Sequence, residues 1–185
     1  VEVKLMLAAL MPYVERGVPI VGLEPSCLLT MRDEYKVLMP GVDADTLANN
    51  VFLLEEFLAT EYKMGRLQLD LKPIAAKQVL LHGHCHQKAF NVMAPVEKVL
   101  SLIPELKVKT IDSSCCGMAG SFGYEKEHYD ISMKMGSLSL FPAVKEADTD
   151  VLIVADGTSC RSQIEHGTGR QAMHVARVLQ MALNS

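Results

Sequence analysis

The amino-acid sequence predicts an α/β fold in which a mainly parallel sheet is flanked by helices. Four short apolar runs have the character of buried strands, and segments with helical spacing lie between them. Strands that alternate with helices are typical of parallel sheets built from βαβ units. In addition, each of the five cysteines follows one of the apolar runs within a few residues. The four predicted strands are residues 18–23, 77–82, 107–112 and 151–155.

The first part of the chain is predicted to hold one strand among helices. Apolar spacing favours a helix over residues 5–14, which Gly17 and Pro19 end before the first strand begins. Two further helices are expected after that strand, over residues 28–38 and 45–62. The first strand therefore leads into a short loop that carries the first cysteine.

The second part of the chain is predicted to hold the other three strands. A helix is expected over residues 87–102 after the second strand, with a kink at Pro95. A glycine-rich loop and a helix over residues 125–140 follow the third strand, and a short helix over residues 142–147 comes next. The fourth strand leads into a loop and then a final helix over residues 171–183.

A repeat links the two parts of the chain. Each copy consists of a helix, a strand and a Ser-Cys pair at the carboxyl end of the strand. We therefore expect residues 1–71 to be the tail of a first, truncated repeat and residues 72–185 to be a complete second repeat, giving two pseudo-repeated lobes. Five residues of the first copy recur with a constant offset of 133 residues (151 minus 18): Val18, Ile20, Val21, Ser26 and Cys27 as Val151, Ile153, Val154, Ser159 and Cys160.

Composition and charge argue against several classes of protein. A net charge of −4, no Trp and only five Tyr argue against a nucleic-acid partner. No apolar run approaches the ~18–20 residues that span a bilayer, so we expect no transmembrane segment. The sequence shows no secretory signal, and an odd count of five cysteines fits reduced cytoplasmic thiols or metal ligands. The start at Val1 suggests a fragment of a larger protein.

Cys115 and Cys116 open a glycine-rich stretch, CCGMAGSFG, which is a poor helix or strand interior. Neighbouring side chains on a strand point to opposite faces, so the two thiols share a centre only where the backbone is irregular. Gly117 supplies that freedom and lets backbone N–H groups approach sulfur. Two other interpretations of Cys115 and Cys116 stay open. The two side chains could be small hydrophobic residues of the core, or they could form a strained disulfide with each other.

The cysteines are expected to meet at one edge of the sheet. The carboxyl ends of parallel strands share an edge, where helix N-termini favour anions such as thiolates. The cysteine spacings are far from the C-x-x-C pairs of zinc ribbons and ferredoxins. The site would therefore be assembled from cysteines that are distant in the sequence and are brought together by the fold, and not from a short local metal-binding motif.

Three segments resemble a known family, the cysteine-rich CCG domains found in heterodisulfide reductase and in the iron–sulfur subunits of glycolate oxidase and anaerobic glycerol-3-phosphate dehydrogenase. The resemblance covers the whole chain and is closest to the C-terminal iron–sulfur region of FAD-linked D-2-hydroxyacid dehydrogenases. One departure is that C-x-x-C ends the motif in the reductase, whereas Cys160 is followed by Arg161, Ser162 and Gln163. The three segments are LEPSC (23–27), HCHQK (84–88) and CCGMAGSFGY (115–124).

The resemblance implies an iron–sulfur electron-transfer domain with a cluster of the 4Fe-4S type. A FAD domain on a missing N-terminal part would oxidise a 2-hydroxy acid, and this module would pass the electrons to a quinone or another acceptor. The module alone is expected to be inactive as a dehydrogenase, and to be cytoplasmic or peripheral at the inner face of the membrane. The implied metal ligands are Cys27, Cys85, Cys115, Cys116 and Cys160.

Several residues near the cysteines are candidates for binding the cofactor. Lys88 and Arg161 would compensate the negative charge of thiolates, unless both are solvated surface residues. On an extended segment, His82, His84 and His86 would share one face. One or two of them, His84 and His86 above all, would donate to cluster sulfur or line a quinone cleft. Alternatives are a zinc or non-haem iron site and purely structural histidines.

Two functional alternatives stay open from the sequence. The main one is a metal-free thiol–disulfide redox module that uses Cys115 with Cys116 or with Cys85. The other is a metal-free interaction domain with vestigial cysteines. Acidic residues beside the cysteine loops, such as Glu24 and Asp156, are interpreted as helix N-caps and not as general bases.

Overall fold

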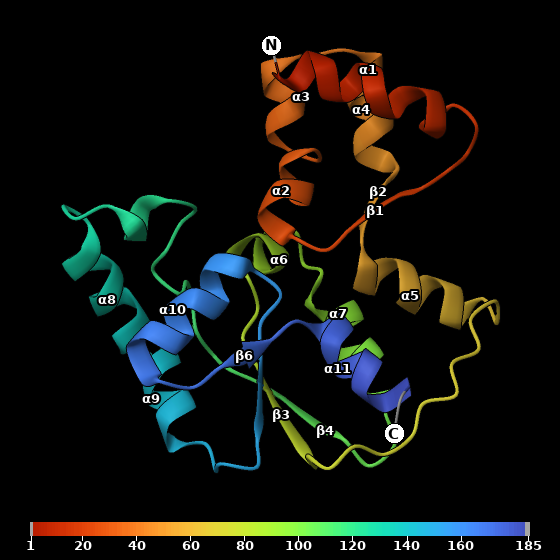
Figure 1. The fold of residues 1–185 in the computed structure, drawn as a ribbon. Coiled ribbons are helices and arrows are strands. Elements are labelled where there is room, and N and C mark those ends of the chain that lie inside the picture. Colours follow the sequence, from red (N-terminus) through yellow and green to blue (C-terminus); the bar gives the residue numbers. More distant parts are fainter. Residues whose placement is uncertain (1, 184–185) are drawn as a thin grey trace.

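The computed structural model describes residues 2–183 and consists of two lobes (Figure 1). The first lobe, residues 2–53, contains a two-stranded parallel sheet, and the second lobe, residues 78–183, contains a four-stranded parallel sheet. The predicted α/β class with parallel sheets and flanking helices is confirmed. Among the helices described, none is long and apolar enough to cross a membrane.

The sheet of the second lobe has the strand order β4-β3-β5-β6, and all of its neighbours are parallel. The register pairs Leu81 with Thr110 of β4 and with Val154 of β5. Parallel neighbours need crossover connections, which the helices between the strands supply. The elements are β3 (Gln78–Leu81), α6 (Cys85–Ala89), α7 (Met93–Leu100), β4 (Lys107–Thr110), η1 (Phe122–Tyr124), α8 (Tyr129–Leu138), α9 (Leu140–Glu146), β5 (Leu152–Val154), α10 (Thr158–Thr168), β6 (Ala172–Met173) and α11 (Val175–Leu183).

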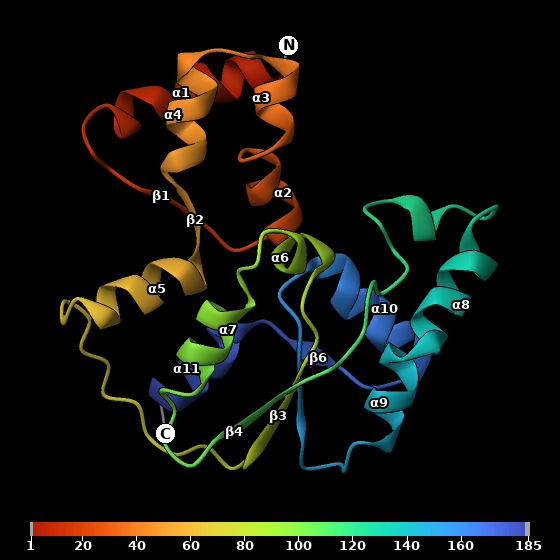
Figure 2. The same cartoon turned by 180° about the vertical axis from the view of Figure 1, so that it is seen from behind.

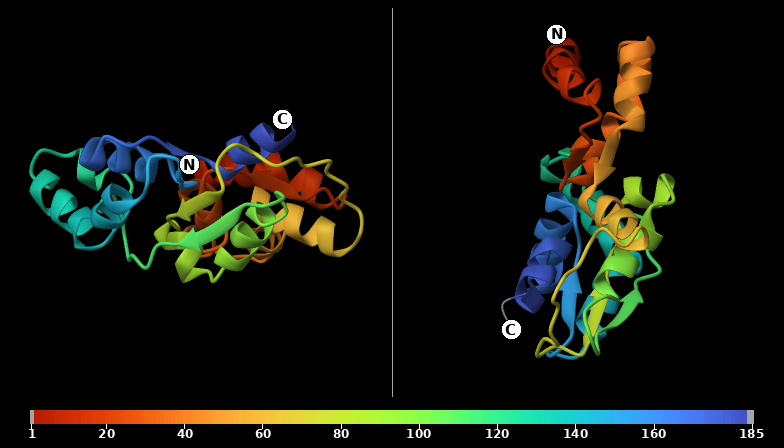
Figure 3. Two further views of the ribbon diagram at one scale, coloured as in Figure 1. Left: turned by 90° about the horizontal axis from the view of Figure 1, so that it is seen from below. Right: turned by 90° about the vertical axis from the view of Figure 1, so that its right-hand side faces the viewer.

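Helices cover both faces of this sheet, as the right-hand view of Figure 3 shows. Side chains alternate along β3, so that Val79 and Leu81 face one core and Leu80 faces the other. The first core is completed by α7 and α11, and the second by α9 and α10. Burial on both faces explains why the strands are short, continuous apolar runs.

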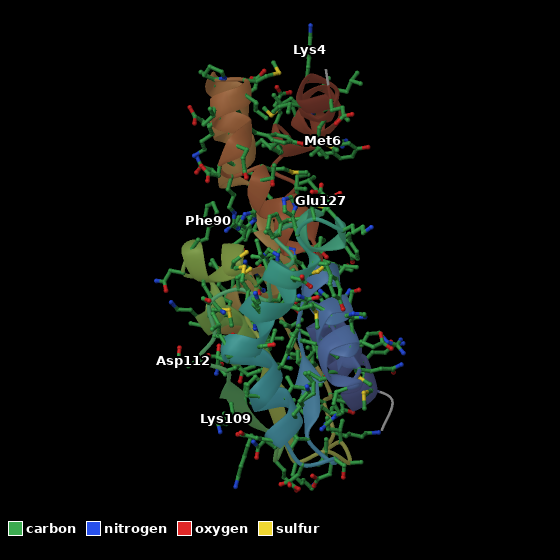
Figure 4. All side chains as sticks on the ribbon, turned by 90° about the vertical axis from the view of Figure 1, so that its left-hand side faces the viewer. Lys4, Met6, Phe90, Lys109, Asp112 and Glu127 are labelled. Carbon is green, nitrogen blue, oxygen red and sulfur yellow. The ribbon has the colours of Figure 1, made fainter. Side chains whose placement is uncertain are left out.

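The first lobe is smaller and is built around its own core. Leu7 and Met11 of α1, Leu29 of α2 and Leu47 of α4 pack against Leu53 of β2. Lys4 and Met6 mark the far end of this lobe in Figure 4, whereas Phe90 of the second lobe packs against its core. The elements are α1 (Glu2–Val14), β1 (Ile20–Gly22), α2 (Pro25–Thr30), α3 (Glu34–Leu38), α4 (Val42–Asn49) and β2 (Val51–Leu53).

Helix α5 (Leu54–Lys63) joins the lobes. It begins directly after β2, yet its Leu58 and Ala59 pack against the core of the second lobe beside α7. The segment after α5 contains no helix or strand until β3 begins. The start of α5 therefore belongs to the junction between the lobes.

Two predicted helices contain strands. The predicted helix over residues 45–62 is interrupted by β2, because the apolar run Val51–Leu53 pairs with β1. The final predicted helix, residues 171–183, begins with β6, which pairs with β5. Runs of two or three apolar residues fit a helix face as well as a strand, and the sheet partner decides between them.

Other element boundaries also differ from the prediction. The helix predicted over residues 28–38 is divided into α2 and α3. The break in residues 87–102 falls at Asn91, which has φ 56°, and Pro95 lies within the first turn of α7, where its missing N–H costs nothing. The helix predicted from residue 125 begins at Tyr129, after η1.

Candidate metal centre

The carboxyl ends of three neighbouring strands bring four cysteines together. Because β4, β3 and β5 are adjacent and parallel, their carboxyl ends share one edge of the sheet. Cys85 is the first residue of α6, after β3, and Cys160 is the third residue of α10, after β5. Cys115 and Cys116 lie in the irregular segment after β4. Figure 2 shows α6 at the end of the second lobe that faces α2.

The four thiols form a continuous chain of contacts. Hydrogen bonds join Cys85 to Cys115, Cys115 to Cys116, and Cys116 to Cys160. Cys116 and Cys160 are only 4% and 2% exposed, whereas Cys85 and Cys115 are half-buried. All four are free thiols. The chain of contacts thus runs from the surface into the interior.

Cysteines that donate a hydrogen bond alternate with cysteines that accept one. The pKa of each acceptor is lowered, and the pKa of each donor is raised. Donation by Cys116 and Cys85 holds the pKa of Cys115 far below its usual range. Donation by Cys116 also lowers the pKa of Cys160 to about 5, against the effect of burial. The donors Cys85 and Cys116 have raised pKa values for the same reason. Metal binding by these side chains would release whatever protons the four thiols still carry.

The glycine-rich loop wraps around Cys115. Gly117 has φ 100°, and its N–H donates to the sulfur of Cys115 over 3.3 Å. A Cβ at this glycine would lie 2.2 Å from the carbonyl oxygen of Ser132, so only glycine fits. The amide of Gln163 holds the loop by donating to the carbonyl of Cys116 over 3.1 Å.

His82 lies against the buried end of the thiol chain. It is 1% exposed, and a ring nitrogen lies within 4.8 Å of the sulfurs of Cys116 and Cys160. Its Nδ1 is 2.9 Å from Oγ of Ser113, and its Nε2 has no hydrogen-bond partner in residues 2–183. If the hydroxyl of Ser113 donates to Nδ1, the ring proton is on Nε2 and can be donated to sulfur, which agrees with the contribution of His82 to the lowered pKa of Cys160.

His84 and His86 do not share one face with His82, because helix α6 begins between them. His84 is the N-cap of α6, and its Nδ1 accepts the N–H of His86 over 3.2 Å. The proton of the neutral ring is therefore on Nε2, which makes His84 a donor and not a ligand. A Cβ on Gly157 would lie 3.5 Å from this Nε2 and 3.2 Å from the sulfur of Cys160. The ring of His86 makes an edge contact with that of His84.

The two predicted cationic residues differ in position. Lys88 Nζ donates to the carbonyls of Ser113 and Ser114. Burial lowers the pKa of Lys88, while negative charge on the nearby cysteine site opposes that shift. Arg161 instead donates to the carbonyl of Asp156 and to Oγ1 of Thr158. Lys88 therefore belongs to the thiol site, and Arg161 supports the turn before α10.

Cys27 is not part of the contacts that join the other four thiols. It is the third residue of α2, and it is exposed. The residue of this segment that does reach the second lobe is Glu24, which accepts hydrogen bonds from N–H and Oγ1 of Thr158 at 2.9 and 2.8 Å. Glu24 therefore caps α10, a helix of the other lobe.

Two residues that line the site, Ser113 and Gln163, were not singled out as binding residues by their sequence pattern. His82 was one of three candidate histidines, and the structure places it against the thiols. His82 had one usable signal, because it follows directly after the buried strand β3 and so points toward the edge where the cysteines meet. Gln163 lies on α10, and nothing in its local sequence indicates that its amide supports the glycine-rich loop.

Curated proteins related to this chain are dehydrogenases or components of them. The chain is 33% identical over 168 residues to a subunit of the anaerobic glycerol-3-phosphate dehydrogenase of Escherichia coli strain K12. It is 29% identical over 167 residues to D-2-hydroxyglutarate dehydrogenase of the same strain and 32% identical over 165 residues to that of Pseudomonas putida. These alignments cover 91%, 88% and 88% of the chain.

The alignments cover only part of each relative. The chain spans 41% of the length of the glycerol-3-phosphate dehydrogenase subunit and 15% of each D-2-hydroxyglutarate dehydrogenase. No family model matches the chain, so its assignment to the CCG domains stays a prediction. No solved structure matches it either. The chain is thus homologous to one region of dehydrogenases and dehydrogenase subunits.

Proposed function

We propose that this chain is the iron–sulfur electron-transfer module of a FAD-linked dehydrogenase. Cys85, Cys115, Cys116 and Cys160 would hold one cluster of the 4Fe-4S type. The observation that supports this most is the chain of contacts between these four thiols, which come from loops after three different strands. Thiolates are the ligands that iron–sulfur clusters take in proteins.

His82 is a candidate for a hydrogen bond to the cluster. Its Nε2 is buried without a hydrogen-bond partner in residues 2–183, and a ring nitrogen lies within 4.8 Å of the sulfurs of Cys116 and Cys160. The hydrogen bond between Nδ1 and Ser113 fixes the orientation of the ring. Because the four cysteines already supply one ligand to each of four irons, His82 would donate a hydrogen bond to sulfur and would not bind iron.

An iron–sulfur cluster would supply reversible one-electron chemistry, and the residues of this chain would tune it. Lys88 places a positive charge beside the thiols, and the N–H of Gly117 donates to the sulfur of Cys115. His84 lies close enough to Cys160 to contribute to the lowered pKa of that thiol. Each of these groups stabilises added negative charge, which favours the reduced state. The half-buried Cys85 and Cys115 would lie on the path by which electrons enter or leave.

The proposed partners are those that the family resemblance implies. A FAD-binding domain, in the same or a separate chain, would oxidise a 2-hydroxy acid or a related alcohol. This module would then pass electrons to a quinone or another acceptor, in the cytoplasm or peripherally at the inner face of the membrane. The curated relatives are named as glycerol-3-phosphate and D-2-hydroxyglutarate dehydrogenases, and each is longer than this chain.

We also propose that the chain carries two copies of one unit, as residues 1–71 and 72–185. The copies pair their strands alike, since β1 with β2 and β5 with β6 are parallel. The predicted offset of 133 residues relates Ile20 of β1 to Ile153 of β5, but not their partners, because Val51 and Ala172 are 121 residues apart (172 minus 51). Cys27 would then be the counterpart of Cys160 in the first copy.

One observation favours a second function, the metal-free thiol–disulfide module. The thiolate of Cys115 touches the thiols of Cys85 and Cys116, as a cysteine pair that cycles through a disulfide would require. Against this, Cys116 and Cys160 are buried, so a partner thiol would reach only the outer pair.

Iron and acid-labile sulfide analysis of the chain, purified without oxygen, separates the two functions. The proposal predicts about four irons and four sulfides per chain, with an EPR signal that appears on reduction with dithionite. Absence of iron, together with thiols that oxidise reversibly to a disulfide, would contradict it and favour the thiol module.

A further inference from the structure

A buried pair of carboxyl groups lies outside the cysteine site, where α5 meets the second lobe. Glu55 is 0% exposed and Asp156 is 1% exposed. One ligating atom of each lies within 4.8 Å of the other and of a ring nitrogen of His174. Neither carboxylate oxygen of Glu55 has a hydrogen-bond partner in the part of the chain that the structure describes. A buried carboxyl group in this situation requires either a cation or a proton.

His174 argues against a metal ion here. Its Nδ1 accepts the N–H of Ala176 over 3.0 Å, so Nδ1 carries no proton. Nε2 must then carry the proton of the neutral ring, which it donates to the carbonyl of Leu23 over 2.9 Å. Neither ring nitrogen has a lone pair left for a metal.

The two carboxyl groups differ in their donors. Asp156 accepts from the amide of Gln87 over 2.8 Å and from the N–H of Val175 over 3.2 Å, and Nε2 of His174 lies 3.6 Å away. These donors stabilise the ionised form of Asp156, whereas no other residue donates to Glu55 among those described. We propose that the pair holds a single proton, carried by Glu55 and directed at Asp156, and that this proton keeps α5 joined to the second lobe.

The surrounding charges support this placement of the proton. Burial raises the pKa of Glu55 to about 8, and the negative charge of Asp156 acts in the same direction. The adjacent Glu56 adds to the shift, and the N–H of Glu55 itself opposes it. The other charged side chains nearby are engaged elsewhere: Glu97 accepts from Thr110, Lys98 lies over the ring of Tyr62, and Arg161 donates to the carbonyls of Ala155 and Asp156.

This proton would make the junction sensitive to pH. Because the folded chain keeps a proton that the unfolded chain releases near pH 4.5, stability falls as the pH rises from there to about 8. Above that pH, two carboxylates repel each other between α5 and the second lobe. The effect reaches the cysteine site through Gln87, whose amide oxygen accepts the N–H of His84, next to Cys85. The inference itself does not depend on a bound cluster.

Infrared spectroscopy tests the proposal directly. At pH 7 the chain should show the carbonyl stretch of a protonated carboxylic acid, shifted in D2O. The band should disappear as the pH rises through about 8. It should be absent from Glu55→Gln and unchanged in Glu127→Gln, which alters an exposed carboxylate.

Urea unfolding gives a second readout. Glu55→Gln should have a higher midpoint than the wild type at pH 8 and 9, and the difference should vanish toward pH 4.5. An ionised Glu55 at pH 7, seen as no acid band that depends on this residue, would overturn the proposal. So would stoichiometric binding of Mn²⁺, detected by EPR, that is lost in Glu55→Gln, because a metal ion would then replace the proton.

Discussion

In both α2 and α10, a cysteine is the third residue of a helix that follows a parallel strand. Cys160 is nevertheless buried among three other thiols, whereas Cys27 is exposed. The difference lies in the neighbours of the preceding strand. β5 is followed across the sheet by β3 and β4, whose loops carry Cys85, Cys115 and Cys116, but β1 pairs with β2 alone within residues 2–183. Each strand–helix unit puts one thiol at the carboxyl end of its strand. That thiol belongs to a multi-cysteine site only where the loops of neighbouring strands also carry cysteines.

The helices α10 and α2 also differ in how their N-termini are capped at the junction between the lobes. The N-terminus of α10 receives its carboxylate from Glu24 of the first lobe, while α2 has Pro25 at its first turn and no side-chain cap. Burial acts to raise the pKa of Glu24, but the hydrogen bonds from Thr158 and Ser26 outweigh it and lower that pKa. Glu24 and Glu55 thus join the same lobes with opposite responses to pH. Bonds to Glu24 weaken at low pH, and the contact through Glu55 weakens at high pH.

The largest effect should come from Gly117→Ala in the second lobe. The added methyl group would meet the carbonyl oxygen of Ser132 at 2.2 Å in a backbone with φ 100°. We expect a loss of roughly 2–4 kcal/mol in the free energy of unfolding and loss of bound iron. Gly17→Ala in the first lobe is the control, because φ is 77° there but nothing lies within 4 Å, and it should cost about 1 kcal/mol. Equal losses in urea unfolding would contradict this account of the loop.

His82→Gln should have an intermediate effect. The substitution removes the imidazole that lies beside the sulfurs of Cys116 and Cys160. We expect the cluster to be retained about 10- to 100-fold less well. His86→Gln is the matched control, since His86 contacts the ring of His84 and not the thiol chain. Iron content measured after dilution compares the two variants, and equal retention would exclude this role of His82.

Lys88→Met should have the smallest effect, on the reduction potential and not on cluster content. Removing a positive charge near the thiols destabilises the reduced state, so the potential should fall. Lys88→Arg should restore most of it, and Lys126→Met, at an exposed site, should leave it unchanged. Redox titration followed by EPR measures all three, and an unchanged potential in Lys88→Met would rule out this role.

Much of the fold could be predicted from the sequence, because buried parallel strands leave continuous apolar runs. All four predicted strands are present, and the cysteine loops after β3, β4 and β5 meet at one edge as the topology requires. The strands β2 and β6 could not be predicted, because Val51–Leu53 and Ala172–Met173 are too short to carry a periodicity. Their pairing with β1 and β5 depends on contacts that only the fold supplies.

The candidate site was predicted less completely than the fold. The sequence pattern indicated the cysteines and Gly117, whose need for an irregular backbone is a local property. The distinct positions of His82, His84 and His86 depend on where α6 begins, and the separation of Cys27 depends on the sheet partners of β1. Neither feature has a signal in the neighbouring residues.

The iron content of two serine variants tests the central claim most directly. Cys160→Ser and Cys27→Ser make the same chemical change at the same position of two similar strand–helix units. Purified without oxygen, Cys27→Ser should retain about four irons and four sulfides per chain, and Cys160→Ser should lose most of both. Equal loss in the two variants would contradict the four-thiol site and would bring Cys27 into the ligand set.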